Sequence, residues 1–203
     1  MPYVLSMIIG YLMGCSHMSF YISKIKNVNL KEKGSKNYGA SNTVAMVGFK
    51  AGFIVFLHDL LKAYFAVLLA RWLFPDIIYA DVIAGIFAVI GHIYPFYLKF
   101  DGGKGFAAFM GAMIGIEPVF TLCLMLFALI FALVVDYIVA GTFIIITIAP
   151  IHIAAMNHDI NLLVLIGIIS LVILFKHREN IKNLITKNGK EMRIREALKK
   201  KYK

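Results

Sequence analysis

The chain has 203 residues, of which 61% are hydrophobic and 16% are charged, and its mean hydropathy is +0.81. Soluble domains average about 45–50% apolar and about 25% charged residues, so this composition excludes an ordinary soluble domain and, with it, a soluble nucleic-acid binder. The net charge of +10 instead indicates an excess of Lys and Arg on the cytoplasmic side of a membrane protein.

Seven apolar runs follow one another along the chain, and a transmembrane helix needs about 20 such residues. No basic segment precedes the first run and no small-residue cleavage site follows it, so we expect a retained span rather than a cleaved signal peptide. Pro118 is expected to begin a helix, because its missing N–H costs nothing in a first turn. Asp136 and the sequence Asn157-His158-Asp159 are expected to break the later runs. The runs cover residues 2–22, 51–74, 77–98, 106–116, 118–135, 137–155 and 162–175, and the fourth is short for a full crossing.

The basic residues are concentrated in three segments, because 19 of the 21 Lys and Arg residues lie in 20–50, in 92–105 or from 176 onward. Seven spans place these segments on one side, which the positive-inside rule makes the cytoplasm. We therefore predict an all-α polytopic protein of the cell membrane with about seven transmembrane helices, its N-terminus outside and its C-terminus cytoplasmic. Residues 1–180 are expected to form one transmembrane domain and residues 181–203 a basic cytoplasmic tail. No internal repeat is evident, which argues against a transporter built from inverted repeats.

The first basic segment contains GSKNYGASNT, from Gly34 to Thr43, and precedes a helix. Glycines let successive backbone N–H groups point into one concavity, and such concavities bind anions, as do helix N-termini. A flexible loop of turn-forming residues has the same composition, so both interpretations stay open at this point.

The second segment, from Gly91 to Gly105, reads GHIYPFYLKFDGGKG. Its last four residues combine backbone N–H groups with one cation before a helix that begins at Phe106, which is typical of a phosphate site. Nucleotide binding through Mg²⁺ is disfavoured, since Gly105 stands where a P-loop needs a hydroxyl residue. The alternative is a solvated hairpin, and its aromatic side chains are interpreted as an interfacial belt.

The third segment, His177 to Ile181, directly follows the last run and reads HRENI. His177 is a candidate proton carrier near neutral pH, and the alternative is a basic stretch attracted to anionic lipid. Within the second run, Asp59 and Lys62 are three residues apart and can form an ion pair. The other candidates are interpreted as packing or interfacial residues, namely His17, His58, His152 and His158 and the two cysteines Cys15 and Cys123.

Taken in this order, the three segments resemble the motifs of the bacterial acyl-phosphate:glycerol-3-phosphate acyltransferases of the PlsY type, which are small membrane enzymes with seven helices. GSKNYGASN resembles the family's GSGNxGATN, GHIYPFYLKFDGGKG resembles its GHxFPxFLxFxGGKG, and HRENI is present unchanged. The resemblance covers nearly the whole chain. It implies transfer of a fatty acyl group from acyl phosphate to the sn-1 hydroxyl of glycerol 3-phosphate. The products are lysophosphatidic acid and inorganic phosphate, in the first acylation of phospholipid synthesis.

The resemblance also implies roles for individual residues. Lys104 binds phosphate, and Ser35 and Asn37 orient glycerol phosphate. His177 and Asn180 hold its phosphate or its hydroxyl, and either His177 or a substrate phosphate takes the hydroxyl proton. The expected partners are acyl phosphate, glycerol 3-phosphate and the lipid bilayer, with no nucleic acid, no metal and no cofactor, and a monomer is expected. Catalysis is thus assigned to Lys104, His177, Asn180 and Ser35, and substrate binding, partly through backbone N–H groups, to Asn37, Gly39, Ala40, Ser41, Asn42, Gly102, Gly103, Gly105, Thr142, His92 and Lys62.

The chain departs from the family's pattern at several positions. Ala45 stands where the family usually has arginine, and Ala63 follows Lys62 where the family tends to have glycine. Thr142 is the remaining hydroxyl residue in a stretch that is serine-rich in the family, and the pattern after HRENI is shifted by an insertion. These changes keep two alternatives open: a catalytically idle relative with a binding or regulatory role, and a small transporter of a phosphorylated anion. Polar motifs gathered on one membrane face favour the enzyme over the transporter.

Overall fold

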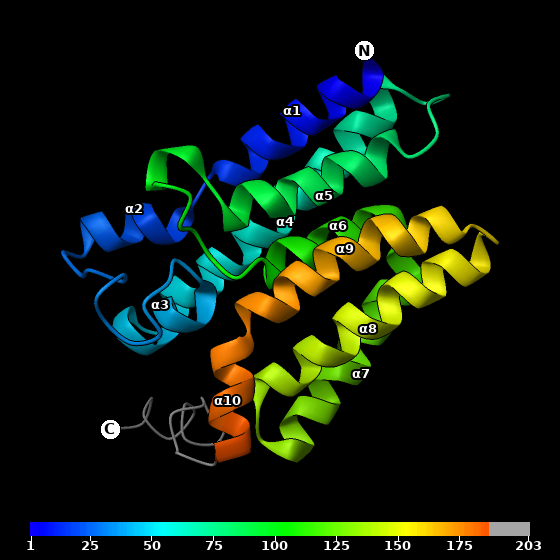
Figure 1. The fold of residues 1–203 in the computed structure, drawn as a ribbon. Coiled ribbons are helices and arrows are strands. Elements are labelled where there is room, and N and C mark those ends of the chain that lie inside the picture. Colours follow the sequence, from blue (N-terminus) through cyan, green and yellow to red (C-terminus); the bar gives the residue numbers. More distant parts are fainter. Residues whose placement is uncertain (187–203) are drawn as a thin grey trace. The chain divides into compact units, whose positions relative to one another are not determined.

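The computed structural model describes residues 1–186, which are helical and include no strand (Figure 1). The chain forms two compact units, Met1–Ile116 and Glu117–Lys203, which are described separately below. Residues 187–203, which make up most of the predicted basic tail, lie outside the described part. The first unit contains α1 (Pro2–Cys15), α2 (Met18–Ile25), α3 (Ala40–Val47), α4 (Phe49–Leu73), α5 (Ala80–Ile93), the 3-10 turn η1 (Phe96–Leu98) and α6 (Phe106–Ile116). The second contains α7 (Pro118–Val135), α8 (Ile138–Met156), α9 (Ile160–Lys176) and α10 (Arg178–Thr186).

Among residues 1–186, five segments are long and apolar enough to cross a membrane: Pro2–Ile25, Phe49–Leu73, Ala80–Leu98, Pro118–Val135 and Ile138–Met156. The helix pair Ile160–Lys176 and Arg178–Ile185 makes a sixth if it is counted as one span bent by 55°. The remaining helix, α6, has 11 residues and is therefore about 16 Å long, half of the roughly 30 Å hydrocarbon core. The prediction of an all-helical, multi-pass membrane protein is confirmed, while the number of seven crossings stays a prediction.

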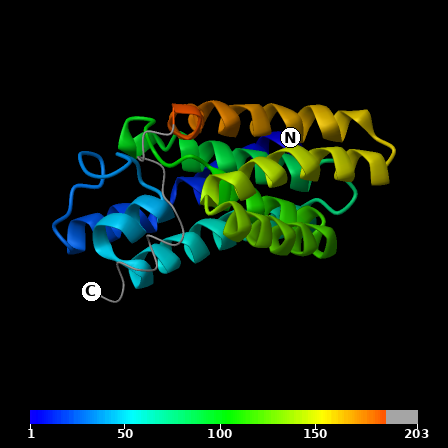
Figure 2. The same ribbon diagram turned by 90° about the horizontal axis from the view of Figure 1, so that it is seen from below.

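In the first unit, small residues let the long helices approach closely. α1 packs along α5, and α4 packs against both α5 and α6 (Figures 1 and 2). Gly10 and Gly14 of α1 lie so close to the carbonyls of Ala84 and Ala88 that a β-carbon on either glycine would overlap these atoms. Gly111 of α6 lies as close to the carbonyl of Leu60 on α4. This packing through small residues is typical of membrane helices, whose association depends on van der Waals contact rather than on the exclusion of water.

The first span is interrupted at Ser16 and His17, between α1 and α2, although the apolar run over residues 2–22 predicted one continuous helix. An interrupted helix inside a membrane must bond its freed carbonyls within the protein. Here the carbonyl of Cys15 accepts a hydrogen bond from the hydroxyl of Tyr97 (2.7 Å), and the carbonyl of Ser16 accepts one from the Lys62 ammonium (2.6 Å). Side chains distant in sequence thus satisfy the break, which explains why the local pattern did not predict it.

In the second unit, α7 packs against α8, and α8 packs against α9. Pro118 occupies the first turn of α7, as predicted. The predicted breaks are also confirmed: Asp136 ends α7 in a left-handed conformation (φ 68°), and Asp159 caps α9 by accepting a hydrogen bond from the N–H of Asn161 (2.9 Å). α10 continues from α9 after a turn at His177, so the predicted domain boundary after residue 180 falls inside a helix.

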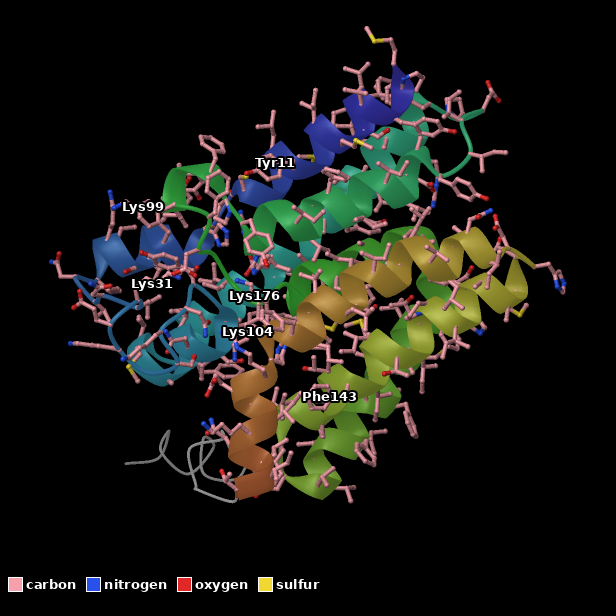
Figure 3. The ribbon with its side chains drawn as sticks, viewed as in Figure 1. Tyr11, Lys31, Lys99, Lys104, Phe143 and Lys176 are labelled. Carbon is pink, nitrogen blue, oxygen red and sulfur yellow. The ribbon has the colours of Figure 1, made fainter. Side chains whose placement is uncertain are left out.

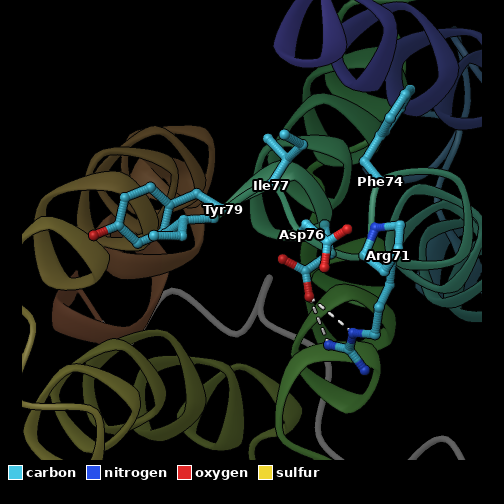
Figure 4. Close-up of a pocket in the computed structure, with 8 residues that line it drawn as sticks. Arg71, Phe74, Asp76, Ile77 and Tyr79 are labelled. Carbon is cyan, nitrogen blue, oxygen red and sulfur yellow. Dashed lines mark hydrogen bonds and ion pairs between the residues drawn. The ribbon is translucent and has the colours of Figure 1, made fainter.

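Arg71 and Asp81 form an ion pair at the end of the first unit where α4 finishes and α5 begins (Figure 4). Both the Nε and a terminal nitrogen of Arg71 donate to Oδ2 of Asp81, at 2.9 and 2.7 Å. The pair borders a pocket of about 290 Å³ that also involves Asp76 and Tyr79. The cation at this end of the unit is therefore balanced by a carboxylate.

Candidate active site

Asn42 organises the first motif. Its side chain is almost fully buried, and its amide nitrogen donates to the carbonyls of Leu30 (2.8 Å), Lys33 (3.2 Å) and Asn37 (2.9 Å). Its amide oxygen accepts from the backbone N–H of Ser35 (2.9 Å). One side chain therefore closes the loop that carries the motif, so the structure gives the Asn42 side chain a scaffolding position.

Gly34, Ser35 and Asn37 determine the local structure of the loop before α3. Gly34 adopts a left-handed conformation (φ 61°), and a β-carbon there would overlap Oδ1 of Asn42, so glycine is required by backbone and by space. The amide of Asn37 donates to the carbonyl (2.9 Å) and to the hydroxyl (3.0 Å) of Ser35, which pairs the two residues expected to orient glycerol phosphate. α3 then begins at Ala40, and no described side chain caps its first turn. The predicted N–H donors of residues 40–42 therefore lie in the first turn of a helix, where anions bind readily.

The glycine pair of the second motif is folded back onto the end of α5. The N–H of Gly102 donates to the carbonyl of Ile93 (3.0 Å), and the N–H of Gly103 donates to the carbonyl of His92 (3.1 Å). We expected these two N–H groups to bind phosphate, whereas the structure uses them inside the protein. The sequence could not show this, because the partner carbonyls belong to a helix that ends nine residues before Gly102.

Lys104 directly follows the glycine pair and precedes α6. Gly105 has a left-handed conformation (φ 92°), and its carbonyl accepts the N–H of Phe109 (2.8 Å) as α6 begins. Figure 3 shows Lys104 at the start of α6, in the same end of the first unit as Lys31 and Lys99. The expected phosphate-binding cation therefore lies beside a helix N-terminus, whose dipole also favours an anion.

The first and second motifs meet in the first unit. Lys31 forms an ion pair with Asp101 (2.6 Å), and its ammonium lies 5.2 Å from the ring centre of Tyr38. A β-carbon on Gly103 would lie 3.0 Å from the carbonyl oxygen of Tyr38, so the two loops are in direct contact. Burial and the nearby charge of Asp101 raise the pKa of Tyr38 above its ordinary value. The structure thus brings the first two motifs into contact, at Tyr38 and Gly103, which are 65 residues apart in the sequence.

A buried polar cluster lies beneath this contact. The Lys62 ammonium donates to Oδ1 of Asp59 (2.8 Å), to Nδ1 of His92 (2.9 Å) and to the carbonyl of Ser16 (2.6 Å). The relative exposure of Asp59, Lys62 and His92 is 1%, 7% and 3%. The ion pair expected from the spacing of Asp59 and Lys62 is confirmed. Lys62 and His92 were expected to bind substrate, but their described contacts are with one another and with buried protein groups.

His17 and His58 lie beside this cluster, and the burial of His17 agrees with the packing position expected for it. His17 has no exposed surface, its ring centre lies 4.7 Å from that of His92, and among the described residues neither of its ring nitrogens has a hydrogen-bond partner. His58 Nε2 lies 3.1 Å from the Ser16 hydroxyl. Donor atoms of His17, Asp59 and His92 lie within 4.8 Å of one another, close enough to hold a metal ion. The Lys62 ammonium already supplies a positive charge to two of them. A histidine inside an apolar run was the sequence signal for this cluster, but the sequence did not identify the side chains that contact that histidine.

The third motif is built at the junction of α9 and α10 in the second unit. His177 is largely buried at the end of α9, and its Nδ1 lies 2.9 Å from the carbonyl of Ile173. A carbonyl only accepts, so in the neutral ring the proton belongs on Nδ1 and Nε2 carries the lone pair. The Phe143 ring packs edge-on against His177, at 6.5 Å between ring centres. Thr142, the preceding residue on α8, is buried, and Asn180 lies in the first turn of α10.

Comparison with known proteins identifies the family to which these motifs belong. The sequence model of the family described as glycerol-3-phosphate acyltransferase matches residues 4–187. The chain belongs to this family. It is 37% identical to the glycerol-3-phosphate acyltransferase of Streptococcus thermophilus, over 91% of this chain and 90% of that protein. It is 36% identical to the enzyme of the same name from Clostridioides difficile, over 95% of each chain.

Two solved structures of PlsY, an integral membrane glycerol 3-phosphate acyltransferase, have the same fold. The glycerol 3-phosphate form aligns with a TM-score of 0.87 and 31% identity over 95% of each chain. The lysophosphatidic acid form aligns with a TM-score of 0.83 and 31% identity over 94% of each chain. These similarities extend over both units and agree with the resemblance found in the three motifs.

Within the family, the departure at Ala45 has a definite place in the structure. Ala45 is exposed on α3, one turn after Asn42. Lys36 and Lys50, the nearest cations in the sequence, are also exposed, and Lys36 has a left-handed backbone (φ 53°). An arginine at position 45 would therefore extend from the helix that begins inside the first motif.

Proposed function

We propose that this chain transfers a fatty acyl group from acyl phosphate to glycerol 3-phosphate, giving lysophosphatidic acid and inorganic phosphate. One observation carries the proposal: the first and second motifs meet at one end of the first unit, where α3 and α6 both begin and where Lys104 lies. Both substrates are phosphates, and helix N-termini together with a lysine provide the positive potential that such groups need. The similar PlsY structure in its glycerol 3-phosphate form supports the same substrate here.

The chemistry requires positioned charge rather than a covalent nucleophile. The sn-1 oxygen of glycerol 3-phosphate attacks the acyl carbonyl carbon, the bond from this carbon to the phosphate oxygen breaks, and phosphate leaves. Acyl phosphate is an activated donor with a good leaving group, so the transfer needs no enzyme ester. We assign to Lys104 the binding and neutralisation of phosphate, and to the Ser35–Asn37 pair the orientation of glycerol phosphate.

Two groups are candidates to accept the proton released from the attacking hydroxyl. His177 suits this role in its neutral form, since Nδ1–H donates to the Ile173 carbonyl and the proton would be taken up at Nε2. A phosphate oxygen of the substrate is the second acceptor. Asn180, three residues after His177, is assigned to hold the phosphate or hydroxyl of glycerol 3-phosphate.

We also propose seven crossings with the N-terminus outside and the motifs in the cytoplasm of the cell membrane. α6 counts as a short crossing in this scheme, and residues 1–180 act as one domain, with α10 continuing across its boundary into the basic tail. Two observations support the orientation. Lys31, Lys99 and Lys104 lie at the end of the first unit where the first two motifs meet (Figure 3), whereas Arg71, where α4 finishes and α5 begins, is neutralised by Asp81.

The decisive experiment is a transfer assay on the purified chain in lipid nanodiscs. Palmitoyl phosphate and labelled glycerol 3-phosphate are expected to give labelled lysophosphatidic acid and inorganic phosphate. Palmitoyl-CoA and palmitoyl-acyl carrier protein, assayed in parallel, are expected to give none. Absence of product with all three donors would refute the proposed function and favour a catalytically idle member of the family.

A further inference from the structure

The two glycines before Lys104 lie directly on two buried histidines. A β-carbon on Gly103 would overlap Nε2 of His92, and one on Gly102 would overlap the His92 carbonyl and lie 3.1 Å from Cε1 of His17. The backbone of the same two glycines donates to the carbonyls of Ile93 and His92. The turn that carries Lys104 is therefore shaped from beneath by His92, through its ring and its carbonyl.

His92 is in turn fixed by Lys62. The three N–H groups of a lysine ammonium match the three acceptors found here, which are the Ser16 carbonyl, Oδ1 of Asp59 and Nδ1 of His92. Because the ammonium has only donors, Nδ1 of His92 accepts, and the ring proton is assigned to Nε2 on the side of Gly103. The charge of Lys62 is balanced by Asp59 inside the span, so the cluster is complete without a substrate anion.

The cluster joins four parts of the first unit: the break between α1 and α2, the middle of α4, the end of α5 and the glycine turn. Charged groups inside a membrane span are costly and are kept where they have a specific role. An ion pair that served only to hold helices together would not need to contact the Gly102–Gly103 turn, which carries the phosphate-binding Lys104.

We propose that Asp59, Lys62 and His92 are positioning residues of the acyltransferase: Lys62, held by Asp59, fixes the His92 ring, and His92 fixes the Gly102–Gly103 turn and thereby Lys104. This rests on the function proposed above. It replaces the direct substrate contact expected for Lys62 and His92 from the sequence. Since a misplacement of about 1 Å can cost about a hundredfold in rate, loosening this turn is expected to act on catalysis without any lost contact to substrate.

The matched variants His92→Asn and His92→Gln test the assignment. The asparagine amide reaches the place of Nδ1, so it keeps an acceptor for Lys62, whereas the glutamine amide reaches the place of Nε2. Asparagine therefore leaves the space under Gly103 empty, and glutamine loses the acceptor for Lys62, so each variant breaks one of the two links and is expected to lower kcat/KM about tenfold or more. A loss of kcat/KM in His92→Asn without any change in the turn itself would show that Nε2 acts on the substrate, and normal kcat/KM in both variants would show that His92 has no role; either result would overturn the proposal.

A second measurement follows the backbone amides of the Gly102–Gly103 turn directly and does not depend on activity. Hydrogen exchange followed by mass spectrometry is expected to show faster exchange in the peptide over residues 96–105 for both His92→Gln and His92→Asn than for the natural chain, because the Gly102 and Gly103 amides lose their protection. Unchanged exchange in both variants would refute the proposal even if the natural chain had no transferase activity. Inactivity of the natural chain itself would refute the proposed function and leave the exchange result valid.

A double variant separates positioning from a merely structural role. Asp59→Asn with Lys62→Met removes both buried charges together and so avoids leaving one unpaired. In the natural chain this double variant is expected to lower kcat/KM about tenfold or more. In a chain that already carries Lys104→Ala, the same two substitutions are expected to lower kcat/KM less than about threefold, because they act on catalysis by misplacing Lys104. Arg71→Met, which breaks the ion pair at the opposite end of the same unit, is the control and is expected to leave kcat/KM and exchange over 96–105 unchanged. A double variant that is less stable but has normal kcat/KM per folded molecule would overturn the proposal.

Discussion

The two units of the chain place their polar side chains in different ways. In Met1–Ile116, Lys62 bonds to residues 46 and 30 positions away, and Asn42 bonds across twelve residues to the Leu30 carbonyl. In the unit that begins at Glu117, Asn157, Ser170 and His177 each contact the carbonyl four positions earlier. The first unit thus forms its site by tertiary contacts, whereas the second orients His177 through the end of its own helix.

This difference predicts how each region responds to substitution. Removing a group that ties several elements together affects both stability and the site, because its partners lose bonds in several places at once. Removing a group bonded within one turn affects that turn. The four predictions below test this contrast, beginning with the residues assigned to the chemistry itself.

Lys104→Ala is expected to lower kcat/KM by about ten- to over a hundredfold and to leave folding intact. The loss of one ionic hydrogen bond to phosphate costs about 1.5–3 kcal/mol, which corresponds to that range. Lys99→Ala is the matched control, since Lys99 is an exposed lysine five residues earlier in the same loop. Steady-state assays with both substrates measure the effect. Full activity of the Lys104 variant would remove Lys104 from the site.

His177→Ala is expected to lower kcat/KM by about ten- to a hundredfold through loss of a hydrogen bond, and by up to about ten thousandfold if His177 is the general base. His158→Ala, an exposed histidine of the same unit, is expected to be silent. The pH dependence of kcat distinguishes the two roles. A lost acidic limb in the variant identifies His177 as the base, and an unchanged profile assigns the proton to the substrate phosphate.

Asn42→Ala and Asn157→Ala compare one asparagine from each unit directly. Asn42 makes four hydrogen bonds, so its loss is expected to reduce the free energy of unfolding by about 2–4 kcal/mol and to raise the KM for glycerol 3-phosphate. Asn157 contacts one carbonyl in the preceding turn, and its loss is expected to change stability by about 0.5 kcal/mol or less. Unfolding in detergent measures both. Equal effects would contradict the contrast between the units.

The same contrast explains what the sequence could predict. Apolar runs, Pro118, Asp136 and the break at 157–159 predicted α7, α8 and α9 within two residues, since each signal acts on its own helix, whereas α10 was expected to belong to the basic tail. The spacing of Asp59 and Lys62 predicted their ion pair for the same reason. The break at Ser16 and His17, the scaffolding position of Asn42 and the bonded N–H groups of Gly102 and Gly103 depend on partners distant in sequence. No local pattern in the chain identifies those partners.

The three motifs were predicted in part: their residue types indicated the kind of site, but not the role of each residue. Their residue types predicted an anion site near Lys104, and the structure places two helix N-termini and the contact between two loops there. The role of each individual group was harder to predict, because glycine and asparagine can donate to a ligand or to the protein itself. His92 illustrates this, since its place in a phosphate-binding motif suggested substrate contact and its neighbours are buried protein groups.

The smallest expected effect concerns Ala45, which stands where the family usually has arginine. An arginine can hold a phosphate through two parallel N–H bonds, so Ala45→Arg is expected to lower the KM for glycerol 3-phosphate. Ala45 is exposed, and exposed ion pairs contribute about 0–1 kcal/mol, so the gain is expected to be about two- to fivefold, with less effect on the KM for acyl phosphate.

An unchanged or higher KM in the Ala45→Arg variant has two explanations, and further variants separate them. Lys36 and Lys50 are the exposed cations nearest in the sequence. If one of them already holds the phosphate, Lys36→Ala or Lys50→Ala raises the KM, and the arginine becomes beneficial in that background. If neither lysine variant changes the KM and the arginine stays without effect in both, glycerol 3-phosphate is not the natural acceptor. Position 45 then lies outside the acceptor site, and the altered first motif is the region in which to look for a different acceptor specificity.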